Sequence, residues 1–216
     1  MMTFVNNDFG DVLLHRSSVR DFDPSVTIPR EELTAMIQET ITAPSACNLQ
    51  AWHFEVVDNA AGKDLLRQYF MKFNLPQLES ASAVVQIFGD TQAFKSYRDL
   101  WNKAAADGRI TPEKRDEVLR TFLPLYEKAP QSMLVADSSV DSAIAATQLM
   151  LVARAHGYET NPIGGYDTTK AAKLFGLDPT RYVPVMAIAI GKPAKNGKDE
   201  MKSARYPVDQ VLHFAD

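Results

Sequence analysis

The segment 138–156 constrains the fold more than any other part of the chain. It reads SSVDSAIAATQLMLVARAH, in which small residues such as Ala143, Ala146 and Ala153 alternate with larger apolar ones. The pattern predicts a helix, because Ser138 and Asp141 have the spacing of a capping box, and Gly157 suits the position just after the last turn. A helix this apolar and this rich in small residues is expected at the centre of the molecule, closely packed.

Three short apolar runs predict strands. HFEVV (53–57) is β-branched and aromatic, while AVVQIFG (83–89) and VPVMAIAIG (183–191) are apolar throughout, as in strands buried on both faces. NPIGGYD (161–167) has the composition of a loop. Helices are expected over 30–41, 61–70, 168–175 and, with a break at 107–112, over 92–128. Few strands separated by helices indicate an α+β or α/β sheet.

Composition excludes several classes of protein. The chain has 216 residues, enough for one domain or a tight pair, and a formal net charge of -4, which argues against a nucleic-acid binder. Cys47 is the single cysteine, so no disulfide framework can form. The first 20 residues lack the pattern of a signal peptide, and no apolar run approaches the ~20 residues that span a bilayer. We therefore predict a cytoplasmic protein with no membrane partner.

Familiar catalytic motifs are absent. The sequence has no G-x-G-x-x-G after a strand, no G-x-x-x-x-G-K-[ST], no G-x-S-x-G and no H-E-x-x-H. Its four histidines are scattered, so no metal site is expected, and no residue is singled out as a catalytic acid, base or nucleophile.

Four short segments could still carry chemistry. HRSSVR (15–20) combines two arginines with two hydroxyls, which fit a phosphate. APSACNLQAW (43–52) offers small residues and two amides to a flat ligand, and NPIGGY (161–166) lets the backbone approach one closely. KSARYP (202–207) places cations in a polar tail. Each segment taken alone is equally compatible with an ordinary turn, connection or solvated charge run.

In this order, the segments resemble the nitroreductase family of FMN-dependent oxidoreductases. HRSSVRDFDP is similar to the family's R-R-S-x-R-x-F opening, and APSACNLQAWHFEVV resembles its A-P-S-x-x-N-x-Q-P-W-x-F segment. VDSAIAATQLMLVARAHGYET, NPIGGYD and VPVMAIAIGKP extend the resemblance over almost the whole chain. It implies a single α+β domain over 1–216, with a mixed central sheet flanked by helices, in an intertwined homodimer with FMN at its interface.

The C-terminal segment 192–216 would then be an extension that packs on the partner subunit. It is polar and basic at first, and its short apolar patch (Val208, Val211, Leu212) could not fold alone. Such a tail is either mobile or lies across another surface.

The resemblance also implies the FMN-binding residues. Arg16 and Ser18, with Ser17 beside them, match positions that hold the phosphate. Arg20 matches a cation at the pyrimidine edge of the ring, and Asn74 matches a ring contact. The other matches are the segment that lines the flavin from the other subunit (Pro44, Ser45, Ala46, Asn48), the loop whose backbone N–H approaches flavin N5 (Ile163, Gly164, Gly165), and phosphate cations in the tail (Arg205 and, more loosely, Lys202).

This chain departs from the family pattern at four positions. Ala51 replaces the usual Pro of Q-P-W, and Lys202 is offset by one from the usual K-x-R spacing. At Gln77 some members carry a Lys that stabilises reduced flavin, so a Gln predicts a flavin that is harder to reduce, with Arg20 as the main cation. Gly164 stands where several members have an acid.

The implied activity is reduction of a planar acceptor by NAD(P)H, in which FMN carries the redox chemistry. A ping-pong order is expected, with hydride passing through flavin N5, because no motif indicates a second nucleotide domain. Arg20 would stabilise the negative charge that develops at the ring. Trp101, Phe122 and Tyr126 are candidates for the acceptor wall, or else core or dimer-interface residues.

Several functions remain open from the sequence. The acceptor could be a nitroaromatic, a quinone, free flavin or an enone. The chain could also be a flavin storage or sensing protein, a relative that performs reductive dehalogenation or flavin fragmentation, or an interaction domain without a cofactor.

Overall fold

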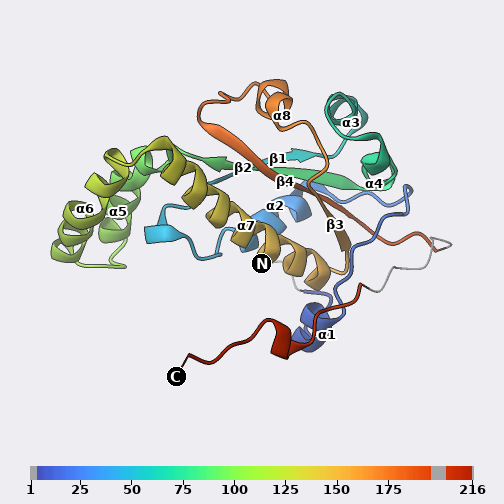
Figure 1. Cartoon of the computed structure of the whole chain (residues 1–216), viewed down its shortest axis with the longest axis horizontal. Coiled ribbons are helices and arrows are strands. Elements are labelled where there is room, and N and C mark those ends of the chain that lie inside the picture. Colours follow the sequence, from blue (N-terminus) through green and yellow to red (C-terminus); the bar gives the residue numbers. More distant parts are fainter. Residues whose placement is uncertain (1–3, 196–202, 216) are drawn as a thin grey trace.

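A four-stranded sheet lies in the middle of the computed structural model, which describes residues 4–195 and 203–215 (Figure 1). The strands are β1 (Trp52–Val57), β2 (Ala83–Asp90), β3 (Glu159–Ile163) and β4 (Tyr182–Gly191). Their order is β1-β2-β4-β3, and every pair of neighbours is antiparallel. An isolated parallel bridge joins Ser18 to Thr160 at the β3 edge of this antiparallel sheet.

Helices cover both faces of this sheet, which confirms the α+β class (Figure 1). One face carries α2 (Arg30–Thr40) and α7 (Gln131–Ala155), and the other carries α3 (Ala60–Arg67), α4 (Leu75–Ser80) and α8 (Thr168–Leu174). The short α1 (Phe9–Leu14) lies near the end of α7. Among the described helices, none combines the length and the apolar character that crossing a membrane requires.

Strand β2 is mostly apolar because it contributes to two cores. Successive side chains of a strand point to opposite faces. Val84 and Phe88 therefore enter the cluster with α3, α4 and α8, while Val85 and Ile87 enter the cluster with α2 and α7. Seven of its eight residues are buried, as expected from the sequence.

Helices α5 (Tyr97–Ala106) and α6 (Pro112–Glu127) form an arm beyond the end of the sheet (Figure 1). The arm has a hydrophobic cluster of its own, which includes Tyr97, Leu123 and Tyr126 and also takes in Leu49 and Ala51 from the segment before β1. This cluster connects the arm to one of the four candidate segments.

Two expectations from the sequence are wrong. The long helix does not start at Ser138: α7 begins at Gln131, after Pro130, so Ser138 and Asp141 lie buried inside it and cap nothing. A proline just before a helix fixes its entry, and the preceding turns of α7 pack on the arm through Leu134. Residues 161–163, expected to begin a loop, instead form the end of edge strand β3, where Pro162 is tolerated because an edge strand need not donate on both sides.

Candidate functional site

The first arginine-rich segment runs along the β3 edge of the sheet. Asp8 caps α1, the helix ends at His15, and the chain then extends so that the Val19 N–H donates to the Thr160 carbonyl at 3.0 Å. Arg16 is half-buried, and its Nη1 is inaccessible to water and has no hydrogen-bond partner among residues 4–195 and 203–215. Ser17 is half-buried and Ser18 is exposed beside it. A buried cationic donor without a partner suits an anion such as the phosphate of FMN.

Arg20 is held by a buried amide. Its Nη2 donates to the Phe73 carbonyl and to the side-chain oxygen of Gln77, each at 3.0 Å. The Gln77 oxygen must face Arg20 because a guanidinium has only donors, and the Gln77 nitrogen then donates to the Asn74 carbonyl. Gln77 is 1% exposed, so this orientation is fixed by its surroundings. Gln77, the residue expected at a position where some family members carry a Lys, thus helps to fix the position of the Arg20 guanidinium.

The paired glycines continue this cluster. Asn74 Nδ2 donates to the Gly165 carbonyl at 2.9 Å, and a Cβ on Gly165 would overlap that amide. Gly165 is therefore required for close approach of the two segments. Ile163 is buried at the end of β3, whereas a Cβ on Gly164 would meet nothing within 4 Å. The position of the family's acid is open space in this chain.

The segment before β1 is strained. Cys47, Asn48 and Gln50 all have positive φ, which costs about 1–2 kcal/mol for each non-glycine residue. Pro44 and Asn48 are exposed, and Ser45 and Ala46 are half-buried. Strain of this kind persists only where surrounding contacts impose it, and it is concentrated at functional sites.

The cluster that contains Arg20, Gln77 and Gly165 lies at one corner of the sheet, and the segment 44–48 lies at the diagonally opposite corner. Ser18 neighbours β3, whose Thr160 is level with Ile190 and Ala83, whereas 44–48 lead into β1 at Trp52. Three strand spacings and six residues along the strands separate the corners by roughly 24 Å. The structure therefore brings Arg16, Ser18, Arg20, Asn74, Gln77 and 163–165 to one corner and does not bring 44–48 to it.

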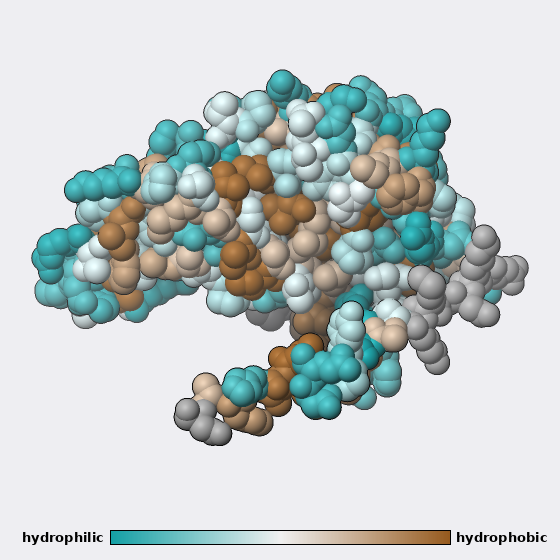
Figure 2. Space-filling view, in the orientation of Figure 1, coloured by the Kyte–Doolittle hydropathy of each residue, from teal (hydrophilic) through white to brown (hydrophobic). Residues whose placement is uncertain are grey.

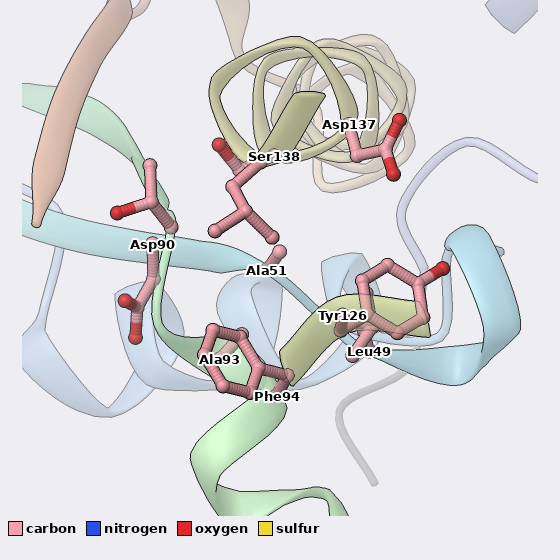
Figure 3. Close-up of a pocket in the computed structure, with 10 residues that line it drawn as sticks. Leu49, Ala51, Asp90, Ala93, Phe94, Tyr126, Asp137 and Ser138 are labelled. Carbon is pink, nitrogen blue, oxygen red and sulfur yellow. The ribbon is translucent and has the colours of Figure 1, made fainter. Parts of the chain in front are cut away.

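The proposed acceptor residues lie inside the hydrophobic cluster of the arm. Tyr126 is buried there, and Trp101 and Phe122 are half-buried against it. Burial, with the Cys47 thiol nearby, raises the pKa of the Tyr126 hydroxyl. The adjoining cavity measures about 10 Å³ and lies between α7 and the rings of Phe94 and Tyr126 (Figure 3). That volume holds a water molecule and no planar substrate.

The described part of the tail, residues 203–215, contributes to neither the Arg20 cluster nor the segment 44–48. Arg205 is exposed, and among the described residues it donates only to Ser203 and Ala204, its own neighbours. Lys202 lies outside the described residues.

Two buried polar residues near these segments escaped the sequence analysis. Thr160, beside Ser18, has a buried hydroxyl, and Asp141, near Ala46, has a buried carboxyl oxygen; neither atom has a hydrogen-bond partner among the residues that the structure describes. The available signal for Asp141 was a carboxylate in a segment rich in apolar and small residues, but its capping-box spacing with Ser138 suggested a helix cap instead. Thr160 had no signal, because no strand was expected between the long helix and the loop at 161–167.

Comparison with known proteins identifies the fold. The family model described as "Nitroreductase family" matches residues 13–192. The enone reductase of CLA biosynthesis from Lactiplantibacillus plantarum is 54% identical over 210 residues, covering 97% of this chain and 95% of that protein. YdgI of Bacillus subtilis (strain 168), assigned as an NAD(P)H nitroreductase, is 40% identical over 208 residues, covering 96% and 98%.

A solved structure agrees with these matches. It is a protein from Exiguobacterium sibiricum 255-15, described as a nitroreductase in complex with FMN, and it has a TM-score of 0.92 at 39% identity, covering 99% of this chain and 100% of that one. The resemblance drawn from the sequence is thereby confirmed: the chain belongs to the nitroreductase family.

Proposed function

We propose that the chain is an FMN-dependent oxidoreductase that uses NAD(P)H to reduce a planar electron acceptor. Family membership supports this, as do the relative described in complex with FMN and the relative assigned as an NAD(P)H nitroreductase. The observation that carries the proposal is the buried Nη1 of Arg16, near Ser18, which has no hydrogen-bond partner within the described part of the chain. An anionic ligand would give that donor its missing partner.

The residues fit the parts of FMN in order along the β3 corner. Arg16 and Ser18 would hold the phosphate, and Arg20 would stabilise negative charge at the pyrimidine edge of the ring. Gly165 would let the backbone approach N5 closely. FMN, when bound, supplies hydride transfer at N5, and the protein positions it and adjusts its electronics. Because one site serves donor and acceptor in turn, a ping-pong order is part of the proposal.

We propose an enone as the first acceptor to test. The relative that is 54% identical is named an enone reductase, and this degree of identity extends over nearly the whole chain. Gly164, within the candidate N5 loop, has no side chain and has open space around it. Several members are expected to have an acid at this position. Nitroaromatics and quinones are the alternative acceptors.

A homodimer would complete the site. The segment 44–48 is roughly 24 Å from the candidate phosphate corner of its own chain, by the strand spacings, so a second copy would have to supply it. Helix α7 exposes Val140 and Ile144, and the tail exposes Val208, Val211 and Phe214. Figure 2 shows hydrophobic surface over α7 and along the tail. Such patches are typical of protein interfaces.

The assembly is tested by the mass in solution. We expect the mass of two chains for the full-length protein. Deletion of residues 203–215 should shift the protein toward the monomer and reduce FMN retention. A monomer that binds FMN as tightly as the intact protein would refute this arrangement.

The function is tested first by the visible spectrum of the purified protein, which should show bound flavin. NADH and NADPH oxidation is then followed with an enone, a quinone and a nitroaromatic. Flavin without turnover would indicate storage or sensing, and loss of FMN during a reductive assay would indicate fragmentation. A protein that takes up no FMN would refute the proposal. Cytoplasmic location stays a prediction, in keeping with the free thiol of Cys47.

A further inference from the structure

The segment Ser45–Ala51 is held in its strained conformation from several sides. Ser45 Oγ accepts from the Gln50 N–H at 3.0 Å, and the Tyr97 hydroxyl donates to the Cys47 carbonyl at 2.9 Å. Asp141 Oδ1 accepts from the Ala46 N–H at 2.8 Å. Three left-handed residues within four positions, Cys47, Asn48 and Gln50, are thus fixed by contacts from outside the segment as well as from within it.

Asp141 is the unusual member of this set. It is 1% exposed in the middle of α7, and its Oδ2 is buried with no hydrogen-bond partner in the described part of the chain. Burial raises the pKa of its carboxyl, an effect opposed by the backbone N–H groups of Ala46 and Ala51 and reinforced by Asp137. A buried carboxyl without a cation is unfavourable for folding, so folding by itself does not explain its presence.

The backbone partner of Asp141 suggests a function. Ala46 directly precedes the left-handed residues, so the carboxyl ties the start of the strained segment to the long, central helix. An acceptor at this place stabilises only the conformation in which the Ala46 N–H points toward α7. Neither Ser45 nor Tyr97 makes such a contact with the helix.

We propose that Asp141 is a positioning residue that holds the Ser45–Ala51 segment in the left-handed conformation required to line the flavin. This inference rests on the proposed function, because it takes the segment to be a flavin contact. Asp141 acts through the backbone of Ala46 and does not itself touch the ligand.

The test compares Asp141→Ala with Asp141→Asn in the full-length protein. Alanine removes the acceptor for the Ala46 N–H, whereas asparagine keeps an oxygen at that place. Asp137→Asn is the matched control, one turn earlier on α7. We measure hydrogen exchange of the Ala46 amide without FMN, the Kd of FMN, the visible circular dichroism of bound flavin, and Tm.

We expect Asp141→Ala to speed exchange at Ala46 while β2 amides keep their protection. Its FMN Kd should rise about tenfold, equivalent to ~1.4 kcal/mol, and its flavin dichroism should change. Asp141→Asn should restore the slow exchange and most of the affinity, and Asp137→Asn should match the wild type. A merely structural role would lower Tm without moving the Kd or the dichroism.

Two results would overturn the inference. One is an Asp141→Ala protein with wild-type exchange at Ala46. The other is faster exchange there with unchanged FMN affinity and dichroism. If Asp141→Ala does not fold, the inference is tested with Asp141→Asn alone. Loss of slow exchange at the Ala46 amide in Asp141→Asn would then refute the inference. A wild-type protein that binds no FMN refutes the proposed function instead, while the exchange data still report whether Asp141 holds the segment.

Discussion

Replacing Arg20 by alanine should lower the reduction potential of FMN bound to this protein. Two-electron reduction places negative charge at the pyrimidine edge of the ring, where we propose that Arg20 lies. Its guanidinium is held in place by two hydrogen bonds of 3.0 Å, which it donates to the Phe73 carbonyl and to the Gln77 side-chain oxygen. A cation there stabilises the reduced form more than the oxidised form, so its loss makes the flavin harder to reduce.

The size of the shift follows from Coulomb's law. A unit charge about 4 Å from the developing charge contributes ~4 kcal/mol at an effective dielectric constant of ~20 and ~1 kcal/mol at ~80. Arg20 is exposed in the single chain, so the effect lies between these limits. For a two-electron couple, ~1.4 kcal/mol corresponds to ~30 mV, so Arg20→Ala should lower the midpoint by roughly 20–90 mV.

Anaerobic redox titration of the FMN-loaded protein against a reference dye measures the shift. Gln77→Ala should lower the midpoint less than Arg20→Ala, because Arg20 keeps its contact with Phe73. Gln77→Glu should approach Arg20→Ala, because its carboxylate offsets the cation. Arg30→Ala is the control, since Arg30, at the start of α2, pairs with Asp58, just after β1, and neither belongs to the candidate site. An Arg20→Ala midpoint within about 10 mV of the wild type would refute the electrostatic role.

Three further predictions concern binding and stability. Arg16→Ala should raise the FMN Kd roughly 10- to 100-fold in equilibrium binding, because it removes a charge-assisted hydrogen bond of about 1.5–3 kcal/mol; unchanged retention would argue against the phosphate site. Gly165→Ala should lower Tm and weaken FMN binding, because its Cβ would overlap the Asn74 amide, whereas Gly164→Ala has open space and should do neither; equal effects in both variants would contradict this reasoning. Burial raises the pKa of the Asp141 carboxyl above its ordinary range, so its contribution to stability is fully present below the unfolded-state pKa and is lost as pH rises through the folded-state pKa. Asp141→Asn should therefore flatten this decline in urea unfolding, and equal pH slopes would count against it.

The local elements were predictable from the sequence because their signals are local. The helix over 30–41 and the strands at 53–57, 83–89 and 183–191 agree with α2, β1, β2 and β4 to within a residue or so at most ends. Apolar spacing reports which face of an element is buried, and this depends little on its partners. The same signals failed for β3, because Pro162 and the following glycines have the composition of a turn.

The candidate site was predictable only in part. Motif order identified the family and the segments that contribute to the site, since a phosphate requires donors and close approach requires glycine. The contacts of Gln77 with Arg20 and of Asn74 with Gly165 depend on the directions of these side chains. No spacing in the sequence specifies those directions.

What the sequence by itself determined is therefore the family, the α+β class and the chemistry of each segment, since these depend on residue types and their periodicity. Only the tertiary structure decided which segments meet. Strand order places residues 16–20 and 44–48 at opposite corners of the sheet, and the packing of α7 brings Asp141 to the Ala46 amide from 95 residues away. Contacts over such separations follow from the pairing of strands and the packing of helices across the whole chain, which a local pattern does not encode.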